Sequence, residues 1–211
     1  MGKVDELIAK LAGDAEAVRP APHPLLLGLL WATAAAVYLA ISLAAAGLRP
    51  DLPAKFHEPA FIAEIAALVG IVLSTGLSAA LLSYPDLHQK RSAAMAPAMV
   101  FALFTLVLAY AWHSDFPPAS LPGHSYQCTV CIILIAALPA AAALYVMRRF
   151  TSTHYRLAGS IALLSAFGIG ALWLRLHEMN DSILHVIEWH YLPMVAVGIF
   201  GLWLGKCLLK W

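Results

Sequence analysis

Charged residues are scarce in this chain. Asp, Glu, Lys and Arg make up 12% of its 211 residues, about half the fraction of a typical soluble domain. Hydrophobic residues make up 62%, and the mean hydropathy is +0.79. These polar residues are too few to cover the surface of a domain in water, and the apolar surface must therefore face lipid. The few basic residues lie between apolar stretches and form no patch for nucleic acid. The composition therefore predicts an integral membrane protein.

The chain also lacks a disulfide framework and a secretory signal. It has three cysteines, Cys128, Cys131 and Cys207. Its first twenty residues include four acidic side chains, and the first apolar run starts only near Pro24. That run is longer than the roughly 7–15 residues of a signal-peptide core. It is predicted to be the first membrane span.

Six segments contain the roughly 20 mainly apolar residues that a transmembrane helix needs. They are about Pro24–Gly47, Ala60–Leu82, Ala93–Trp112, Cys128–Met147, Leu157–Leu176 and Trp189–Leu209. The loops between them are short, so neighbouring helices are expected to be antiparallel. The predicted fold is therefore all-α: a six-helix transmembrane domain over residues 24–211, preceded by a short head over residues 1–23.

Basic residues fall mostly on one side of these spans, which predicts the orientation. With the N-terminus inside, all but three of the 13 basic residues face the cytoplasm. The three on the other side are Arg49, Lys55 and Arg175. An even number of spans places the C-terminus inside as well, so both termini are expected in the cytoplasm.

The head is predicted to be a short amphipathic helix. Apolar residues recur at helical spacing, and the opposite face holds four acids against two lysines within residues 1–18. Helices that lie on lipid are usually basic on the polar face, so the acidic face favours docking in a protein groove. A helix that lies on the membrane or caps the bundle is the alternative. The docking residues would be Leu7, Ile8 and Leu11.

A Cys-x-x-Cys pair, Cys128 and Cys131, lies at the outer end of the fourth span. Two thiols three residues apart share a helix face, which suits a disulfide-exchange pair or a clamp for a soft metal. Simple packing is the alternative, since cysteine is a common small hydrophobe in apolar helices. Histidines on the same side of the membrane favour a functional pair: His113, His124, His177, His185 and His190.

Two further patterns concern the inside of the bundle. Glu64 and Arg175 both lie toward the outer face at membrane depth, where they either form an ion pair or reach water separately. Gly201 and Gly205 form a GxxxG pattern, which lets helix backbones approach closely.

Several short motifs, taken in order, carry a resemblance over essentially the whole chain. They are the acidic head with Leu7-Ile8, Leu11-Ala12, Asp14 and Val18-Arg19-Pro20, the outer cysteine and inner Arg148-Arg149 of the fourth span, and the tail with Leu176-His177, Asp181, Trp189, Gly201, Gly205 and Leu208–Trp211. In these features the chain resembles NrsF-type proteins, membrane-bound negative regulators of sigma factor F.

The resemblance implies a non-enzymatic anti-sigma factor of the bacterial inner membrane. Such a protein holds an extracytoplasmic-function sigma factor through its cytoplasmic head and releases it on heavy-metal or related stress, sensed by outer cysteines. Carried onto this chain, the binding residues would be Leu7, Ile8, Leu11, Val18 and Arg19, and the sensing residues Cys128 and Cys131. No resident cofactor is implied, although a soft transition-metal ion would be the signal.

One position departs from the family pattern. Members tend to have a second cysteine just after the histidine that ends the fifth span, and here that position is Glu178. A disulfide between spans is therefore in doubt, and a metal site is the alternative. Its candidate ligands are Cys128, Cys131, His124, His177 and Glu178.

Two rival functions start from the same residues. The outer thiols would suit a membrane thiol oxidoreductase of the DsbB kind, but such enzymes need a second outer cysteine pair, which this chain lacks. The histidines would suit a metal or small-solute transporter, but they cluster on one face and no polar path crosses the bilayer.

Overall fold

The computed structural model of the chain describes residues 2–14, 21–85, 91–114, 125–150 and 152–210, and all regular structure in these ranges is helical. Six helices are long and apolar enough to cross a membrane, as predicted. Five of them are α2 (Pro24–Ala46), α4 (Pro59–Leu82), α6 (Ala96–Ser114), α7 (Tyr126–Arg148) and α8 (Tyr155–His177). The sixth runs from Ile183 to Leu208 through α9 (Ile183–Val186), the π-helix η2 (Ile187–Tyr191) and α10 (Leu192–Leu208).

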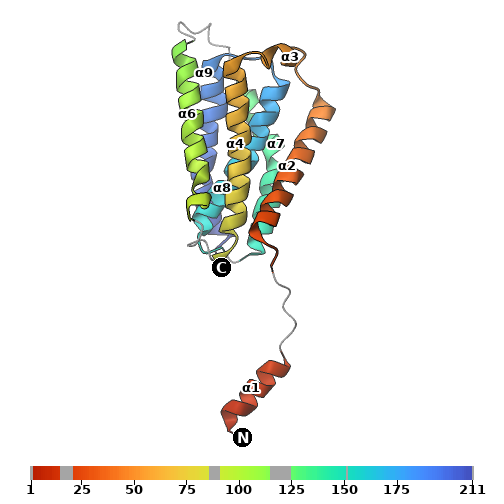
Figure 1. Cartoon of the computed structure of the whole chain (residues 1–211), viewed down its shortest axis with the longest axis vertical. Helices are drawn as coiled ribbons and strands as arrows, with labels where there is room; N and C mark the ends of the chain where they lie inside the picture. The colour runs from red at the N-terminus through yellow and green to blue at the C-terminus, as the bar shows by residue number, and fades with distance from the viewer. Residues whose placement is uncertain (1, 15–20, 86–90, 115–124, 151, 211) are drawn as a thin grey trace.

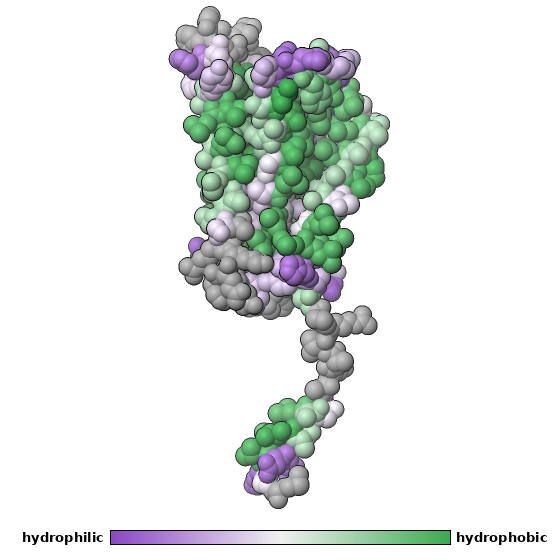
Figure 2. Space-filling view, in the orientation of Figure 1, coloured by the Kyte–Doolittle hydropathy of each residue, from purple (hydrophilic) through white to green (hydrophobic). Residues whose placement is uncertain are grey.

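The ends of the spans follow local backbone chemistry. Pro24 and Pro59 begin α2 and α4, where the missing N–H of proline costs nothing. Gly47 ends α2 at a positive φ of 91°, a conformation that glycine adopts without strain. Figure 2 shows hydrophobic residues along the bundle and hydrophilic residues gathered at its two ends.

Helix α8 forms the centre of the bundle and packs against α2, α4, α7 and α10. In the 18-residue apolar stretch of α8, 89% of the residues are buried. The corresponding value for α2, at the periphery, is 11%. Glycine permits this packing: a Cβ on Gly159 would come within 2.5 Å of the Gly201 carbonyl and the Gly205 Cα on α10. The GxxxG pattern of the sixth span therefore lies directly against α8.

The sixth span begins earlier than predicted, at Ile183 instead of Trp189, and it contains a π-helix. A proline inside the span provides the physical reason. Pro193 has no N–H to donate to the carbonyl of Trp189 four residues before it, so regular α-helical bonding cannot continue there. Residues 183–188, which the sequence placed in a loop, are thus helical.

The two ends of the bundle hold different elements. The end that we call distal holds α3 (Leu52–Lys55) and residues 178–182, and the end that we call proximal holds α5 (Arg91–Ala94) and the C-terminus. Helix α1 (Lys3–Gly13) lies apart from the bundle, beyond the proximal end (Figure 1).

Candidate functional site

Two histidines at the distal end lie together because of the π-helix. His185 is on α9 and His190 on η2, five residues later. A π-helix closes its hydrogen bonds over five residues, so side chains five apart return to the same face. The ring centroids of His185 and His190 are 5.1 Å apart, and both residues are buried, at 1% and 2% exposed.

A cysteine on α7 is held against this pair. The Thr129 hydroxyl donates a 2.7 Å hydrogen bond to the Trp189 carbonyl, the group that Pro193 cannot serve. This bond ties the first turn of α7 to the π-helix. It places the neighbouring Cys128 beside the histidines, where its thiol donates to Glu178 Oε1 at 3.3 Å.

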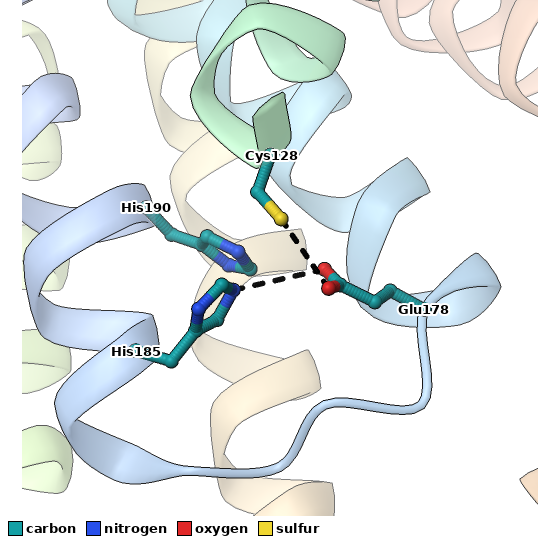
Figure 3. A group of neighbouring side chains, drawn as sticks. All are labelled: Cys128, Glu178, His185 and His190. Carbon is teal, nitrogen blue, oxygen red and sulfur yellow. Dashed lines mark hydrogen bonds and ion pairs between the residues drawn. The ribbon is translucent and has the colours of Figure 1, made fainter. Parts of the chain in front are cut away.

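Glu178 completes the group from the end of α8. Its backbone N–H donates to the Leu174 carbonyl at 2.7 Å and closes the last turn. One carboxylate oxygen accepts from Cys128, and the other lies 3.7 Å from His185 Nε2 (Figure 3). One ligand atom each from Cys128, Glu178, His185 and His190 lies within 4.8 Å of the others. We call these four residues the distal cluster.

The polar atoms of the distal cluster are short of partners. Both ring nitrogens of His185 and of His190, and Glu178 Oε2, are buried without a hydrogen bond. Burying such groups unpaired is costly, and buried polar side chains nearly always have partners. Burial alone would raise the pKa of Glu178, but its contacts with His185 and Cys128 lower the pKa below the usual value. One sulfur, one carboxylate and two imidazoles are a donor set that binds transition metals.

The structure brings together only some of the residues predicted for the site. Cys128 and Glu178 meet, whereas the His177 ring stacks on Trp173 and places Nδ1 2.8 Å from the Gly47 carbonyl. Cys131 packs against the apolar core, and both thiols are free. His124 lies outside the described residues. The sequence had only grouped His185 and His190 with other histidines, although their five-residue spacing just before Pro193 was the available signal.

Ion pairs clamp the chain next to the distal cluster. Arg175 on α8 forms a bidentate pair with Glu64 on α4, at 2.7 and 2.8 Å, so the two membrane-depth charges pair with each other. Arg49 has no exposed side-chain surface and bonds both Asp51 and Asp181, at 2.7–2.9 Å. Lys55 reaches Asp181 at 2.9 Å.

The same clamp fastens the distal end of α2 to the end of α8. The Arg49 backbone N–H donates to the Leu176 carbonyl at 3.0 Å. The hydrogen bonds that the Arg49 guanidinium donates to the Asp51 and Asp181 carboxylates raise its pKa. Burial alone would raise the pKa of Asp181, but hydrogen bonds from Arg49 and Lys55 bring it far below the usual range. Asp181 is therefore charged at neutral pH and holds the residues that follow Glu178.

Helix α1, at the other end, leaves its apolar side chains uncovered. Leu7, Ile8 and Leu11 are 56%, 60% and 62% exposed, and no residue of α1 is buried. Asp5 and Glu6 lie in its first turn. Val18 and Arg19, the other predicted binding residues, lie outside the described residues.

These features define a polytopic helical membrane protein. A cluster of cysteine, glutamate and histidine side chains lies at one end of its bundle, and a helix with an uncovered apolar face lies beyond the other end. Residues 11–211 match the family described as "Negative regulator of sigma F", NrsF. The chain belongs to this family.

A curated relative matches over the full length. The chain is 29% identical over 215 residues to the "Anti-sigma-F factor NrsF" of Caulobacter vibrioides (strain NA1000 / CB15N), and the match covers 99% of this chain and 100% of that protein. No solved structure matches the chain.

Proposed function

We propose that this protein is an anti-sigma factor of the bacterial inner membrane that sequesters an extracytoplasmic-function sigma factor through α1. Both termini lie in the cytoplasm, and the distal end faces the periplasm. Heavy-metal or redox stress at that end releases the sigma factor. Family membership supports the anti-sigma role, because the family and the Caulobacter protein are both named for it.

The observation that carries the proposal is the uncovered apolar stripe of α1. Val4, Leu7, Ile8 and Leu11 are each more than half exposed, although they lie on one helix face. An amphipathic helix with such a stripe is suited to bind in a groove of a partner protein, with its apolar side chains as anchors. The alternative is that the stripe lies on the inner leaflet of the membrane. The acidic first turn of α1 disfavours this, because the lipid surface there is anionic.

Contacts from the distal cluster to α2 support a signal route toward the head. Glu178 directly follows Leu176 and His177, which bond the Arg49 N–H and the Gly47 carbonyl at the distal end of α2. The other end of α2, at Pro24, leads to the head. A movement of Glu178 therefore reaches α2 through two direct hydrogen bonds, and α2 spans the bundle as a single helix.

The oxidoreductase alternative gains nothing from the structure. It needs a second cysteine pair near the first, and the one other cysteine of the chain, Cys207, lies near the proximal end of α10.

Co-purification from membranes tests the proposal. The tagged full-length protein is expressed with each extracytoplasmic-function sigma factor of its host, and retention is compared with that of Leu7→Asp and Leu11→Asp. Truncating a buried anchor of an interface typically costs about 2 kcal/mol or more, so retention should fall at least ~30-fold. Lys10→Asp, which places the same side chain on the polar face, should retain the sigma factor. Equal retention by Leu7→Asp and the wild type would contradict the proposal.

A further inference from the structure

We propose that the distal cluster is a four-ligand site for one divalent transition-metal ion of borderline softness, such as Zn²⁺ or Co²⁺, with Cys128, Glu178, His185 and His190 as ligands. The binding of a metal ion at this site does not depend on the proposed function. That this ion is the signal that releases the sigma factor does rest on the proposed function. It also differs from a soft-metal clamp made by the Cys-x-x-Cys pair.

The donor set selects the class of metal. Two imidazoles, one sulfur and one carboxylate are the ligands that four-coordinate Zn²⁺ accepts in proteins. Mg²⁺ and Ca²⁺ prefer all-oxygen sites, and Cu⁺ prefers thiolate and thioether sulfur. Only one sulfur is present among the four donors, so the site favours a borderline ion.

Charge balance selects the valence. The Cys128 thiolate and the Glu178 carboxylate together carry two negative charges, and neutral imidazoles add none. A divalent ion therefore makes the site neutral, whereas a monovalent or trivalent ion would leave a net charge between two half-buried ligands and two buried ones, which is costly. On binding, the Cys128 S–H bond breaks, the sulfur bonds the metal, and the proton leaves to solvent.

The geometry requires only a small closure. Tetrahedral ligands at roughly 2.0–2.3 Å from zinc are about 3.3–3.8 Å apart, and the donor atoms here lie within 4.8 Å of one another. Closure draws together the start of α7, the end of α8 and the α9–η2 turn, which contribute one, one and two ligands. It also gives one of the two orphaned nitrogens of each ring, His185 and His190, a partner.

The neighbouring candidates are excluded by their own contacts. His177 is stacked on Trp173 and bonded to the Gly47 carbonyl, so its ring is already engaged. Cys131 contributes no atom to the cluster, although it packs against the same apolar core as Cys128. Both residues therefore serve as matched controls for the ligands.

Cobalt titration of the full-length protein tests the site. The protein is purified in detergent, stripped with a chelator and titrated with Co²⁺. Visible d–d bands of a tetrahedral site and a thiolate-to-cobalt charge-transfer band should saturate at one ion per chain, with release of one proton. Zn²⁺ should displace the Co²⁺ and abolish both signals, because it binds such sites more tightly.

Variants assign the ligands. Cys128→Ser should abolish the charge-transfer band, whereas Cys131→Ser, the same change one turn along α7, should keep it. His185→Gln and His190→Gln should each weaken Co²⁺ binding at least ~100-fold. Even the loss of a residue that only hydrogen-bonds to a metal ligand typically lowers metal affinity about 10–100-fold. His177→Gln should leave binding within about threefold. Circular dichroism establishes that each variant is folded.

Variants of Glu178 test whether the charge of this ligand contributes to the affinity for a divalent ion. Glu178→Gln removes one negative charge and should weaken Zn²⁺ binding, whereas Glu178→Cys restores the charge and should raise the ratio of Cd²⁺ to Zn²⁺ affinity. Absence of Co²⁺ binding by the folded wild type, or a charge-transfer band that requires Cys131 instead of Cys128, would overturn the inference. Sigma-factor retention, measured on the same preparation, reports separately on the proposed function.

Discussion

Removing one partner of the buried ion pair between α4 and α8 should destabilise the bundle strongly. In Glu64→Gln the side chain keeps its shape but loses its charge. The Arg175 side chain is 4% exposed and donates hydrogen bonds of 2.7 and 2.8 Å to Glu64. The substitution leaves the Arg175 guanidinium buried in an apolar bundle without the negative charge that Glu64 places beside it.

The expected size follows from what Arg175 retains. Removing one member of a buried pair usually costs about 3–5 kcal/mol. Arg175 still has the Asn180 carbonyl at 2.9 Å and Asp181 at 3.3 Å, so we expect the lower end of that range, about 3 kcal/mol. The double change Glu64→Leu with Arg175→Met should cost less than the sum of the single changes, because it leaves no unpaired charge.

Unfolding in mixed micelles, followed by circular dichroism, measures this cost. Glu58→Gln is the matched control, since Glu58 also pairs with a basic residue, Lys55 at 2.9 Å, but is 55% exposed. An exposed pair contributes about 0–1 kcal/mol. If Glu64→Gln destabilises the protein no more than Glu58→Gln does, the pair does not hold α4 to α8 and our account of the clamp is wrong.

Three further predictions concern packing, pH and the anchoring of the site. Gly205→Ala should cost about 1–3 kcal/mol in the same assay, because its Cβ would strike the Tyr155 carbonyl and the Gly159 backbone, whereas Gly198→Ala meets only the movable tip of Leu164 and should cost less. Because the pKa of Asp181 is lowered on folding, its stabilisation is complete above about pH 4 and is lost as pH falls further, so Asp181→Asn should flatten the acid limb of a stability–pH curve. Thr129→Val removes the 2.7 Å bond to the Trp189 carbonyl and should cost about 0.5–1.5 kcal/mol and weaken Co²⁺ binding.

Sequence periodicity and length were enough to predict the bundle. All six spans were found, and five have ends within three residues of the prediction, because a stretch of about 20 apolar residues has few other solutions. The start of the sixth span was wrong. His185 and Glu188 lower the local hydropathy to a value typical of a loop. Hydropathy also contains no information on the π-helix that precedes Pro193.

The site was harder to predict than the bundle. Cys128 was chosen as part of the Cys-x-x-Cys pair at the outer end of a span, and Glu178 because it stands where family members tend to have a second cysteine. The structure does bring the two residues together. His177 was chosen as one of the histidines on the outer side and grouped with Glu178, yet its ring turns to Trp173 and Gly47. Side-chain direction at a helix end depends on the neighbouring helix, and one sequence contains no record of that neighbour.

We propose that a metal ion bound at the distal cluster controls whether α1, beyond the proximal end, holds a sigma factor. The direct measurement is retention of the sigma factor by full-length protein in lipid nanodiscs as Zn²⁺ is added, for the wild type and Cys128→Ser. We expect Zn²⁺ to release the sigma factor from the wild type and to leave it bound to Cys128→Ser. Retention of the sigma factor by the wild type at a Zn²⁺ concentration that saturates the site would show that metal binding at the distal cluster does not control α1.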